Sequence, residues 1–279
     1  MADEISRAIL ITGCSTGIGR ATAEHLATRG HTVYATARRP ESIADLAPKG
    51  CRILALDVTD EASMQAAIRQ VEQAEGAVGV LVNNAGYAQD GPIEEVPPDA
   101  VRRQFETNVF GLVRLTQLAL PGMRRQRWGR VINVSSVGGK VVFPGGGFYH
   151  ATKWAVEAIS EALRFEVRPF GIDVAVIEPG AIKSSYEETS LGAMAGGAEG
   201  SPYAGFNQDR AERVRAAYSG KTAGPEAVAR VIAHAATAKH PRTRYTVTAQ
   251  ARVVMSLRRV LPDRMWDRFI ASQFKPPRP

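Results

Sequence analysis

Seven short apolar runs, separated by segments of helical length, constrain this chain more than any other feature of its sequence. The runs cover Ala8–Thr12, Thr32–Thr36, Arg52–Leu56, Val78–Val82, Arg130–Val134, Asp173–Ile177 and Tyr245–Thr248. Several are apolar throughout rather than at alternate positions, which is typical of strands buried on both faces of a parallel sheet. We therefore predict an α/β fold, a doubly wound (Rossmann-type) sheet of seven parallel strands with helices on both faces.

Nothing in the sequence separates one domain from another, so we expect residues 1–279 to form a single domain. Of the 279 residues, 44% are hydrophobic, which is enough for a sizeable core. Residues 183–224 show no sustained periodicity. A structureless insert of that length in a compact domain is more often functional than accidental, so we interpret it as a lid over the substrate. Residues 251–279 predict two short amphipathic helices on either side of Pro262.

Charge and cysteine content argue against several classes of protein. The formal charge is +7, but the 35 basic residues are interspersed with 28 acidic ones over most of the chain, so we expect no nucleic-acid partner. Cys14 and Cys51 form no C-x-x-C pair and the five histidines are scattered, so we expect neither a disulfide nor a metal. No window approaches the roughly 18 apolar residues of a membrane span. We therefore expect a cytoplasmic protein.

A glycine-rich turn follows the first predicted strand and precedes a helical segment that ends at Gly30. Glycines let a backbone approach a pyrophosphate closely, and the free N–H groups at the start of a helix attract anions. Such turns also simply connect a strand to a helix, but the position after the first strand favours nucleotide binding. We predict that the turn contacts a cofactor through Gly13, Ser15, Thr16, Gly17, Ile18 and Gly19.

The spacing of this turn and three later motifs resemble the short-chain dehydrogenase/reductase family. The turn reads G-x-x-x-G-x-G, and residues 83–86 read N-N-A-G at the end of the fourth predicted strand. Asn108 matches the family's mid-helix asparagine, and Tyr149 with Lys153 matches its Y-x-x-x-K. The motifs keep the family's order and spacing from Thr12 to about Ser184. This resemblance implies a dinucleotide-dependent oxidoreductase.

The resemblance also implies further cofactor contacts. It places Asn84, Ala85 and Gly86 beside the cofactor, and Asp57 with Val58 beside the adenine. Asp57 could equally cap the helix that follows, a role for which Thr59 and Asp60 are as well suited. The segment after the sixth predicted strand resembles the family's P-G-x-[IV]-x-T turn next to the cofactor carboxamide, with Ser184 in the threonine's place. Its predicted contacts are Pro179, Gly180 and Ile182.

The end of the second predicted strand distinguishes NADP from NAD. An acidic residue there would accept hydrogen bonds from the ribose 2′-hydroxyl and repel a 2′-phosphate. This sequence instead has Ala37, Arg38 and Arg39. A guanidinium pairs with a phosphate in a forked, charge-assisted geometry. We therefore predict NADP (NADPH) as the cofactor and Arg38 as its phosphate ligand, assisted by Thr36 and Arg39. The alternative is that Arg38 is a solvated loop arginine.

Tyr149 and Lys153 are the predicted catalytic pair. They are four residues apart at the start of a predicted helix, so their side chains share one face. The ammonium and the positive end of the helix would both lower the pKa of the tyrosine from its usual value of about 10. Tyr149 would then act as acid and base while a hydride moves between nicotinamide and a hydroxyl or keto carbon. The resemblance adds that Lys153 binds the nicotinamide ribose.

Two more residues complete the predicted catalytic set. Ser136 precedes Tyr149 by thirteen residues, where the family has the serine that binds the substrate oxygen. Its neighbour Ser135 is the rival. Because successive side chains near a strand end point to opposite faces, only one of the two should reach the site, and the spacing favours Ser136. The resemblance implies that Asn108 holds a water connecting Lys153 to solvent.

The substrate is predicted to be a lipophilic alcohol or ketone. Its pocket would use apolar residues near Tyr149 and in the insert: Phe143, Phe148, Tyr186, Leu191, Met194, Tyr203 and Phe206. The segment VYATAR also resembles hydroxysteroid and retinol dehydrogenases. Alternatively, these side chains pack the insert onto the body. Proteins of this fold can also bind a dinucleotide without catalysis, but those usually lack the tyrosine and lysine.

The resemblance further implies a homodimer or homotetramer that pairs through the helices carrying the asparagine and tyrosine motifs. Residues 251–279 hold several arginines but only two acids, Asp263 and Asp267. Contact with a membrane surface is therefore one alternative for this segment. We favour the other, in which its apolar face closes over the substrate pocket or packs on a second subunit while the arginines stay solvated.

Overall fold

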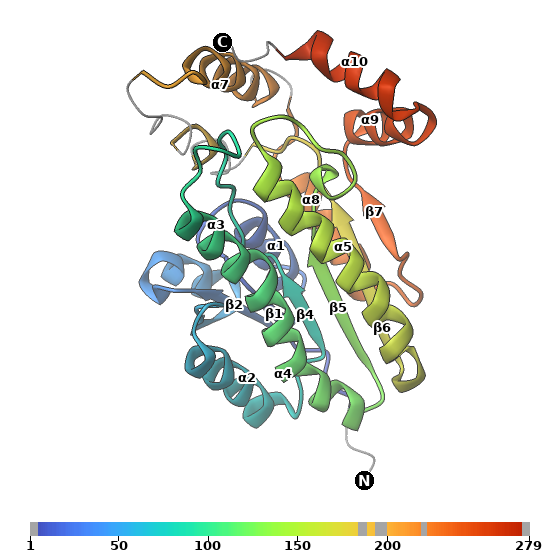
Figure 1. Ribbon diagram of the computed structural model, residues 1–279. Helices are drawn as coiled ribbons and strands as arrows, with labels where there is room; N and C mark the ends of the chain where they lie inside the picture. The colour runs from blue at the N-terminus through green and yellow to red at the C-terminus, as the bar shows by residue number, and fades with distance from the viewer. Residues whose placement is uncertain (1–4, 184–188, 193–199, 219–221, 275–279) are drawn as a thin grey trace.

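The computed structural model describes residues 5–183, 189–192, 200–218 and 222–274. At its centre lies a parallel sheet with the strand order β3-β2-β1-β4-β5-β6-β7 (Figure 1). The strands are β1 (Ile9–Ile11), β2 (Val33–Ala37), β3 (Cys51–Ala55), β4 (Val80–Asn83), β5 (Gly129–Val134), β6 (Ile172–Glu178) and β7 (Arg244–Thr246). All seven predicted strands are confirmed to within about two residues at their ends.

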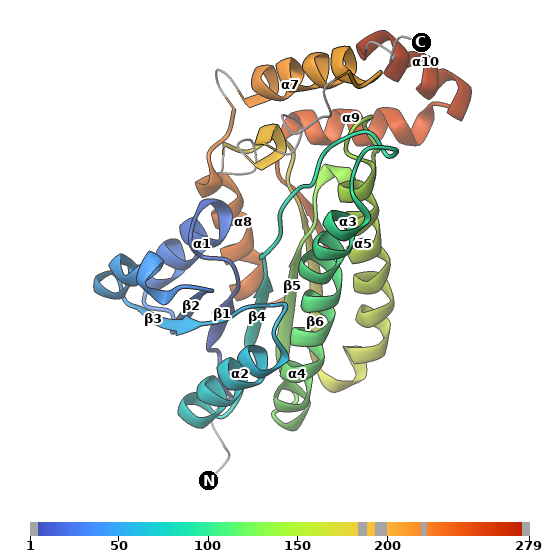
Figure 2. The same cartoon turned by 60° about the vertical axis from the view of Figure 1, so that its left-hand side comes forward.

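Helices cover both faces of this sheet because side chains alternate along each buried strand. Ile9 and Ile11 of β1 belong to a core with α1 (Gly17–Ala27) and α8 (Pro225–Thr237). Leu10, between them, belongs to a second core with α2 (Glu61–Glu75), α4 (Gly111–Arg125) and α5 (Gly147–Val167). Figure 2 shows α1 and α8 on one side of the sheet and α4 and α5 on the other. The predicted doubly wound α/β fold is therefore confirmed.

The remaining helical elements are short or lie near the ends of the sheet. They are η1 (Pro40–Lys49), α3 (Pro98–Phe105), the π-helical turn η2 (Glu106–Phe110), η3 (Val137–Gly139), η4 (Arg168–Phe170), α7 (Ala204–Tyr218), α9 (Ala249–Val260) and α10 (Asp263–Gln273). Helices α7, α9 and α10 gather beyond the carboxyl ends of the strands (Figure 1). Within the described ranges, no helix has the length and apolar character needed to span a membrane.

The insert contains a helix that we did not expect. Residues 204–218 form the 15-residue helix α7, so the prediction of a structureless insert is wrong there. Only Phe206, Asn207 and Val214 of α7 are buried, which explains why the segment lacks a sustained apolar period. The two helices predicted on either side of Pro262 are confirmed as α9 and α10. The predicted pocket residues Tyr186 and Met194, and Ser184, lie outside the described residues.

The strand order creates a switch point beside β1. The chain runs outward from β1 to β2 and β3, then crosses back to place β4 on the other side of β1. In open α/β sheets the connections on the two sides of such a point diverge and leave a crevice at the carboxyl ends of the strands. The glycine-rich turn after β1 and the N-N-A-G segment after β4 both lie at this crevice.

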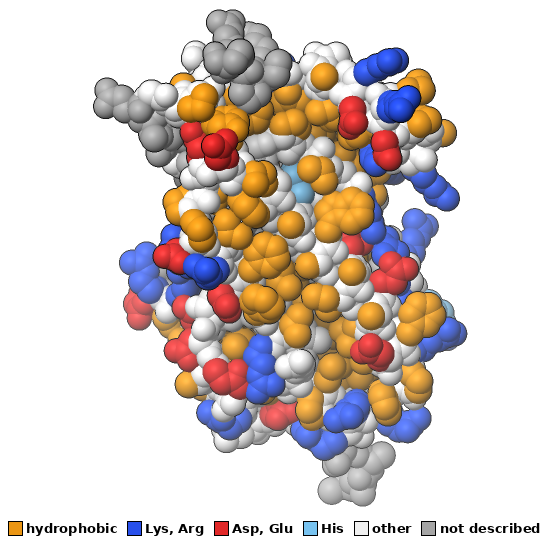
Figure 3. Space-filling view, in the orientation of Figure 1, with side chains coloured by type: hydrophobic (Ala, Val, Ile, Leu, Met, Phe, Trp, Pro, Cys, Tyr) orange, Lys and Arg blue, Asp and Glu red, His pale blue; other side chains and the backbone are white. Residues whose placement is uncertain are grey.

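One face of the molecule carries exposed apolar side chains over α4 and α5 (Figure 3). Phe165 is 72% exposed, Phe110 54% and Trp154 48%. Side chains of this size are usually covered, so a patch of them marks a surface suited to association.

Candidate active site

A crevice of about 1250 Å³ runs from the glycine-rich turn to helices α7, α9 and α10. It brings together most of the predicted site residues, which come from the carboxyl ends of β1, β2, β3, β4, β5 and β6 and from the start of α5. Its walls include Gly13, Ser15, Thr16, Gly17, Ile18, Arg38, Asp57, Val58, Asn84, Ala85, Gly86, Ser136, Tyr149, Lys153, Pro179, Gly180 and Ile182. Two predicted residues, Gly19 and Asn108, lie behind the wall rather than in it.

The glycine-rich turn is held against the end of β4. Gly13 has a φ of +71°, and a Cβ there would lie 3.0 Å from the Cα of Ala85, so only glycine suits this position. The hydroxyl of Thr12 accepts hydrogen bonds at 2.9 Å from the backbone N–H groups of Asn84 and Ala85. Gly19 packs against Gly13 and Asn84 with no room for a side chain. Its role is therefore to allow this close packing.

Arg38 lies where β2 ends at the crevice. It is exposed, and its guanidinium forms no ion pair with any residue that the structure describes. Thr36 cannot assist it, because the Thr36 hydroxyl is buried and donates to the backbone oxygen of Ile11 at 2.9 Å. Arg39 does not line the crevice either. The expected assistance from Thr36 is therefore wrong in this structure, and the structure gives no support for assistance from Arg39. Arg38 is the arginine of this segment that lines the crevice.

The structure separates the two roles considered for Asp57. Asp60 caps α2, since its Oδ1 accepts the N–H of Ser63 at 3.1 Å. Oδ1 of Asp57 instead accepts from the N–H and the hydroxyl of Thr59, at 2.9 and 2.7 Å. Asp57 is left on the crevice wall beside Val58.

Tyr149, Ser136 and Lys153 converge at the start of α5. Tyr149 lies in the first turn of the helix and is hydrogen bonded to Ser136, which follows β5. The Ser136 hydroxyl also accepts the N–H of Gly138 at 3.0 Å, which orients it. The hydroxyl of Ser135 is buried and has no partner among the described residues. Nζ of Lys153 lies 5.7 Å from the centre of the Tyr149 ring.

Burial shifts both titrating groups of this pair toward neutrality. It raises the pKa of Tyr149 well above its usual value, and the hydrogen bond with Ser136 offsets only part of that rise. Burial lowers the pKa of Lys153 to about 8, against the opposing effect of the Glu157 charge. The expected lowering of the Tyr149 pKa is therefore wrong for this structure, because desolvation of the phenol is the largest influence and the charge of Asp90 also raises this pKa. Tyr149 is a phenol at neutral pH.

Asn108 lies in the π-helical turn η2, which interrupts the helix between α3 and α4. Its side chain accepts from the N–H of Tyr87 at 3.0 Å and donates to the backbone oxygen of Tyr87 at 2.9 Å and to the hydroxyl of Thr152 at 3.1 Å. A Cβ on Gly86 would lie 3.0 Å from its Oδ1 and 3.7 Å from Nζ of Lys153. Asn108 is therefore close to Lys153, and its role in holding a water stays a prediction.

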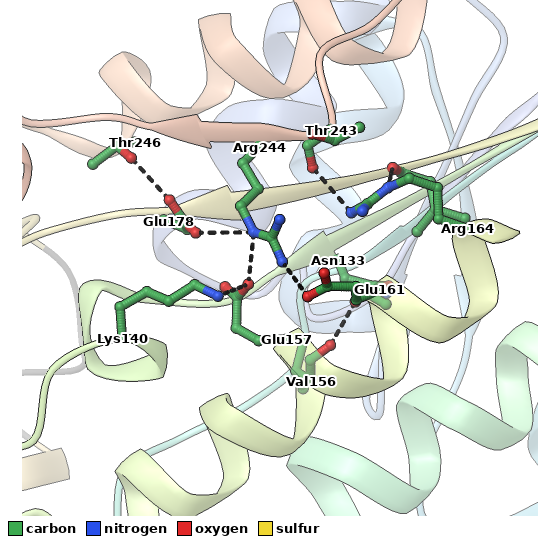
Figure 4. Close-up of polar contacts among 12 residues, drawn as sticks. Asn133, Lys140, Val156, Glu157, Glu161, Arg164, Glu178, Thr243, Arg244 and Thr246 are labelled. Carbon is green, nitrogen blue, oxygen red and sulfur yellow. Dashed lines mark hydrogen bonds and ion pairs between the residues drawn. The ribbon is translucent and has the colours of Figure 1, made fainter. Parts of the chain in front are cut away.

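An ion-pair network around the buried carboxylate of Glu157 was not predicted from the sequence (Figure 4). Oε2 of Glu157, one turn beyond Lys153 on α5, contacts Nζ of Lys140 at 2.9 Å and Nε of Arg244 at 3.1 Å. Arg244 also reaches Glu161 at 3.0 Å. Because Lys140 directly follows η3, Glu157 joins the turn that carries Ser136 to the helix that carries Tyr149. The K-x-x-x-E spacing places Glu157 on the same helix face as Lys153, but nothing in the sequence pairs Glu157 with Lys140 or Arg244.

The far end of the crevice is largely apolar. Among the predicted pocket residues, Phe143 lines it, whereas Phe148, Leu191, Tyr203 and Phe206 do not. Most of its apolar wall comes from α7, α9, α10 and the residue that follows α10, namely Val214, Ala217, Val254, Phe269, Ile270 and Phe274. The C-terminal helices therefore close over the crevice, as favoured above. Sequence reasoning missed two polar residues of this region, His150 and Arg210.

Comparison with known proteins places this geometry in a family. The model of the short-chain dehydrogenases matches residues 7–193. A 3-ketodihydrosphingosine reductase of Bacteroides thetaiotaomicron is 42% identical over 181 residues, which span 64% of this chain and 65% of that protein. An NADPH-dependent 3-dehydrocapnine reductase of Ornithobacterium rhinotracheale is 36% identical over 282 residues, covering 96% of this chain and 98% of the relative.

Comparison with solved structures also finds short-chain dehydrogenases. A short-chain dehydrogenase from Streptomyces avermitilis superposes with a TM-score of 0.78 at 35% identity, covering 96% of this chain and 98% of the other. The closed form of serine dehydrogenase with NADP⁺ gives a TM-score of 0.74 at 26% identity, over 86% and 93% of the two chains. The fold and the crevice define a dinucleotide-dependent oxidoreductase. This chain belongs to the short-chain dehydrogenase family.

Proposed function

We propose that this protein is an NADP(H)-dependent oxidoreductase that interconverts a secondary alcohol and a ketone of a lipophilic substrate. The observation that carries the proposal is the hydrogen bond between Ser136 and Tyr149 on the crevice wall, with Lys153 one helical turn away. Three polar groups that share a buried wall and include a protonated phenol are suited to binding and protonating one oxygen atom.

In the reducing direction, Tyr149 and Ser136 both donate hydrogen bonds to the oxygen of a bound carbonyl. Two donors on one oxygen stabilise the negative charge that develops there, and Tyr149 then transfers its proton. NADPH bound in the crevice would supply the hydride. In the oxidising direction, Tyr149 accepts the proton of the hydroxyl, and the charge of Lys153 favours the phenolate that this step requires.

The residues of the crevice fit NADP. The glycine-rich turn leaves its backbone open to a pyrophosphate, and α1 begins at Gly17 directly after it. Arg38 offers a guanidinium that forms no ion pair with a described residue, at the place where a 2′-phosphate would lie, and no acid occupies the end of β2. The names of a similar reductase and of the solved serine dehydrogenase complex, which mention NADPH and NADP⁺, support the same choice.

A lipophilic substrate is supported by the apolar part of the crevice wall that Val254, Phe269, Ile270 and Phe274 form. Two relatives named for the reduction of 3-ketodihydrosphingosine and 3-dehydrocapnine are consistent with that chemistry. We further propose a homo-oligomer that pairs through the exposed apolar patch on α4 and α5. Cys14 and Cys51, both buried free thiols, support a cytoplasmic location.

The test is oxidation of NADPH by the purified protein with a panel of steroid, retinoid, long-chain aliphatic and sugar-derived ketones, followed at 340 nm. We expect turnover with at least one apolar ketone and a lower rate with NADH. The competing function is a regulator that binds the dinucleotide without catalysis. It would show NADPH binding by calorimetry and no turnover with any ketone or alcohol of the panel.

A further inference from the structure

A buried ion pair forms part of the otherwise apolar substrate end of the crevice. Arg210 projects from α7, and its Nη2 lies 3.2 Å from Oδ2 of Asp90, in the segment between β4 and α3. The Arg210 side chain is 11% exposed and that of Asp90 is fully buried. Arg210 lines the crevice, whereas Asp90 lies behind it. The guanidinium is therefore the side of this ion pair that a substrate would meet.

Asp90 holds this arginine in a fixed orientation. The same carboxylate oxygen also accepts the hydroxyl proton of Ser190, so the two parts of the insert that contain Ser190 and Arg210 share one partner. A guanidinium has five N–H donors. Within the described residues, Nη2 donates to Asp90 and Nη1 has no acceptor, while Nε is buried in the protein. Donors that the protein leaves unsatisfied in a pocket are suited to an acceptor on the ligand.

The guanidinium lies close to the predicted reaction centre. A Cβ on Gly146 would lie 3.3 Å from Nη2 of Arg210 and 2.8 Å from Nε2 of His150, so the two side chains converge over the residue that precedes α5. The rings of His150 and Tyr149 are 5.7 Å apart. Burial and the charge of Arg210 lower the pKa of His150 to about 4, so this histidine is neutral at neutral pH. Tyr149, His150 and Arg210 thus follow one another along the wall.

The charges that α7 presents to the crevice are positive. Arg210 and Arg213 line it, whereas their partners Asp90 and Asp209 do not. Beyond them the wall turns apolar, through Val214, Phe269 and Phe274. A substrate that satisfies both parts of the wall has an anionic group near its reacting carbon and an apolar chain beyond it.

We propose that Arg210 is a specificity-determining residue that binds an anionic group, a carboxylate, sulfonate or phosphate, carried within a few bonds of the carbonyl or hydroxyl carbon. This inference rests on the proposed function and specifies its substrate class. Asp90 and Ser190 position the guanidinium, which pairs with the anion in a charge-assisted geometry. The apolar chain of the substrate lies against α9 and α10.

Binding measurements test the role of Arg210, and turnover measurements test the proposed function separately. The probes are 3-hydroxydecanoate and its methyl ester, which differ in one charge, and 2-decanol as a plain secondary alcohol. Calorimetry on the protein saturated with NADP⁺ should show the carboxylate binding about tenfold or more tighter than the ester, the ratio expected when a charge-assisted hydrogen bond is gained. Arg210→Met should abolish this preference and leave the affinity for the ester within about threefold.

Two further variants separate recognition from folding. Arg215→Met alters an exposed arginine of the same helix outside the crevice wall and should keep the preference. Arg210→Met combined with Asp90→Asn leaves no buried charge unpaired and should lose the preference like the single variant. The proposal is overturned if the parent protein binds the carboxylate and the ester equally tightly. It is also overturned if both Arg210 variants lose affinity for the carboxylate and for the ester by the same factor. Turnover of 2-decanol alongside such a result would leave the proposed function standing, whereas absent turnover of all three alcohols would count against that function.

Discussion

Nζ of Lys153 donates a hydrogen bond to the backbone oxygen of Val134 at 2.9 Å. This bond joins α5 to the end of β5, the strand that leads into Ser136. It keeps the ammonium buried, where desolvation lowers its pKa to about 8. The Lys153 ammonium, which is expected to favour the Tyr149 phenolate, therefore titrates close to neutral pH. Its charge depends on the residues around it.

Glu157→Gln should shift the pH dependence of the enzyme. The Glu157 charge opposes the lowering of the Lys153 pKa, so its removal lowers that pKa further and Lys153 loses its proton at a lower pH. We expect the alkaline fall of kcat/KM for ketone reduction to move to lower pH by roughly one unit. Glu161→Gln is the matched control, because Glu161 also pairs with Arg244 but is more than half exposed. Identical profiles for the two variants would contradict this role of Glu157.

The phenol of Tyr149 should stay protonated in the protein without cofactor. Burial raises its pKa, so the folded protein binds this proton more tightly than the unfolded chain does. A spectrophotometric titration at 295 nm of the parent and of Tyr149→Phe should therefore give the same phenolate signal below about pH 10. An extra tyrosinate in the parent below pH 9 would show that the ammonium outweighs burial.

The cofactor preference should depend on two neighbouring positions. Ala37→Asp with Arg38→Gln places a carboxylate at the end of β2 and removes the guanidinium that faces the crevice. We expect the ratio of kcat/KM for NADPH over NADH to fall by about 10² or more, since one change adds repulsion and the other removes attraction. Arg39→Gln should leave the ratio within about twofold, because Arg39 does not line the crevice. Equal use of NADH and NADPH by the parent would refute the assignment of Arg38.

The exposed apolar patch should be an interface between copies of this chain. Trp154 and Phe165 lie on α5, and Phe110 is the last residue of η2, directly before α4. Covering these side chains removes apolar area from water. Light scattering at micromolar concentration should give two or four times the 30.0 kDa mass of the chain. Phe165→Glu with Trp154→Glu should reduce that mass, while Val260→Glu, on an exposed residue of α9, should not. A parent mass near that of one chain would contradict this expectation.

The sequence predicted best those features that are local in the chain. β1, the glycine turn and α1 are contiguous, and Tyr149 and Lys153 share one helix face, so spacing alone brings their atoms together. Partners distant in the chain were not predictable in this way. Asp90 meets Arg210, and Glu157 meets both Lys140 and Arg244, only because the sheet brings separate segments together. The raised pKa of Tyr149 was missed for the same reason, since burial depends on the whole fold.

Turnover by Tyr149→Phe is the direct test of Tyr149 as the general acid. With a ketone that the parent reduces, we expect kcat to fall by about 10² to 10⁴, the usual contribution of a general acid, and NADPH affinity to stay within about threefold of the parent. Tyr203→Phe, which removes a hydroxyl bonded to Glu94 outside the crevice wall, should keep parental turnover. A kcat for Tyr149→Phe within threefold of the parent, in a protein that still binds NADPH, would show that Tyr149 is not the general acid.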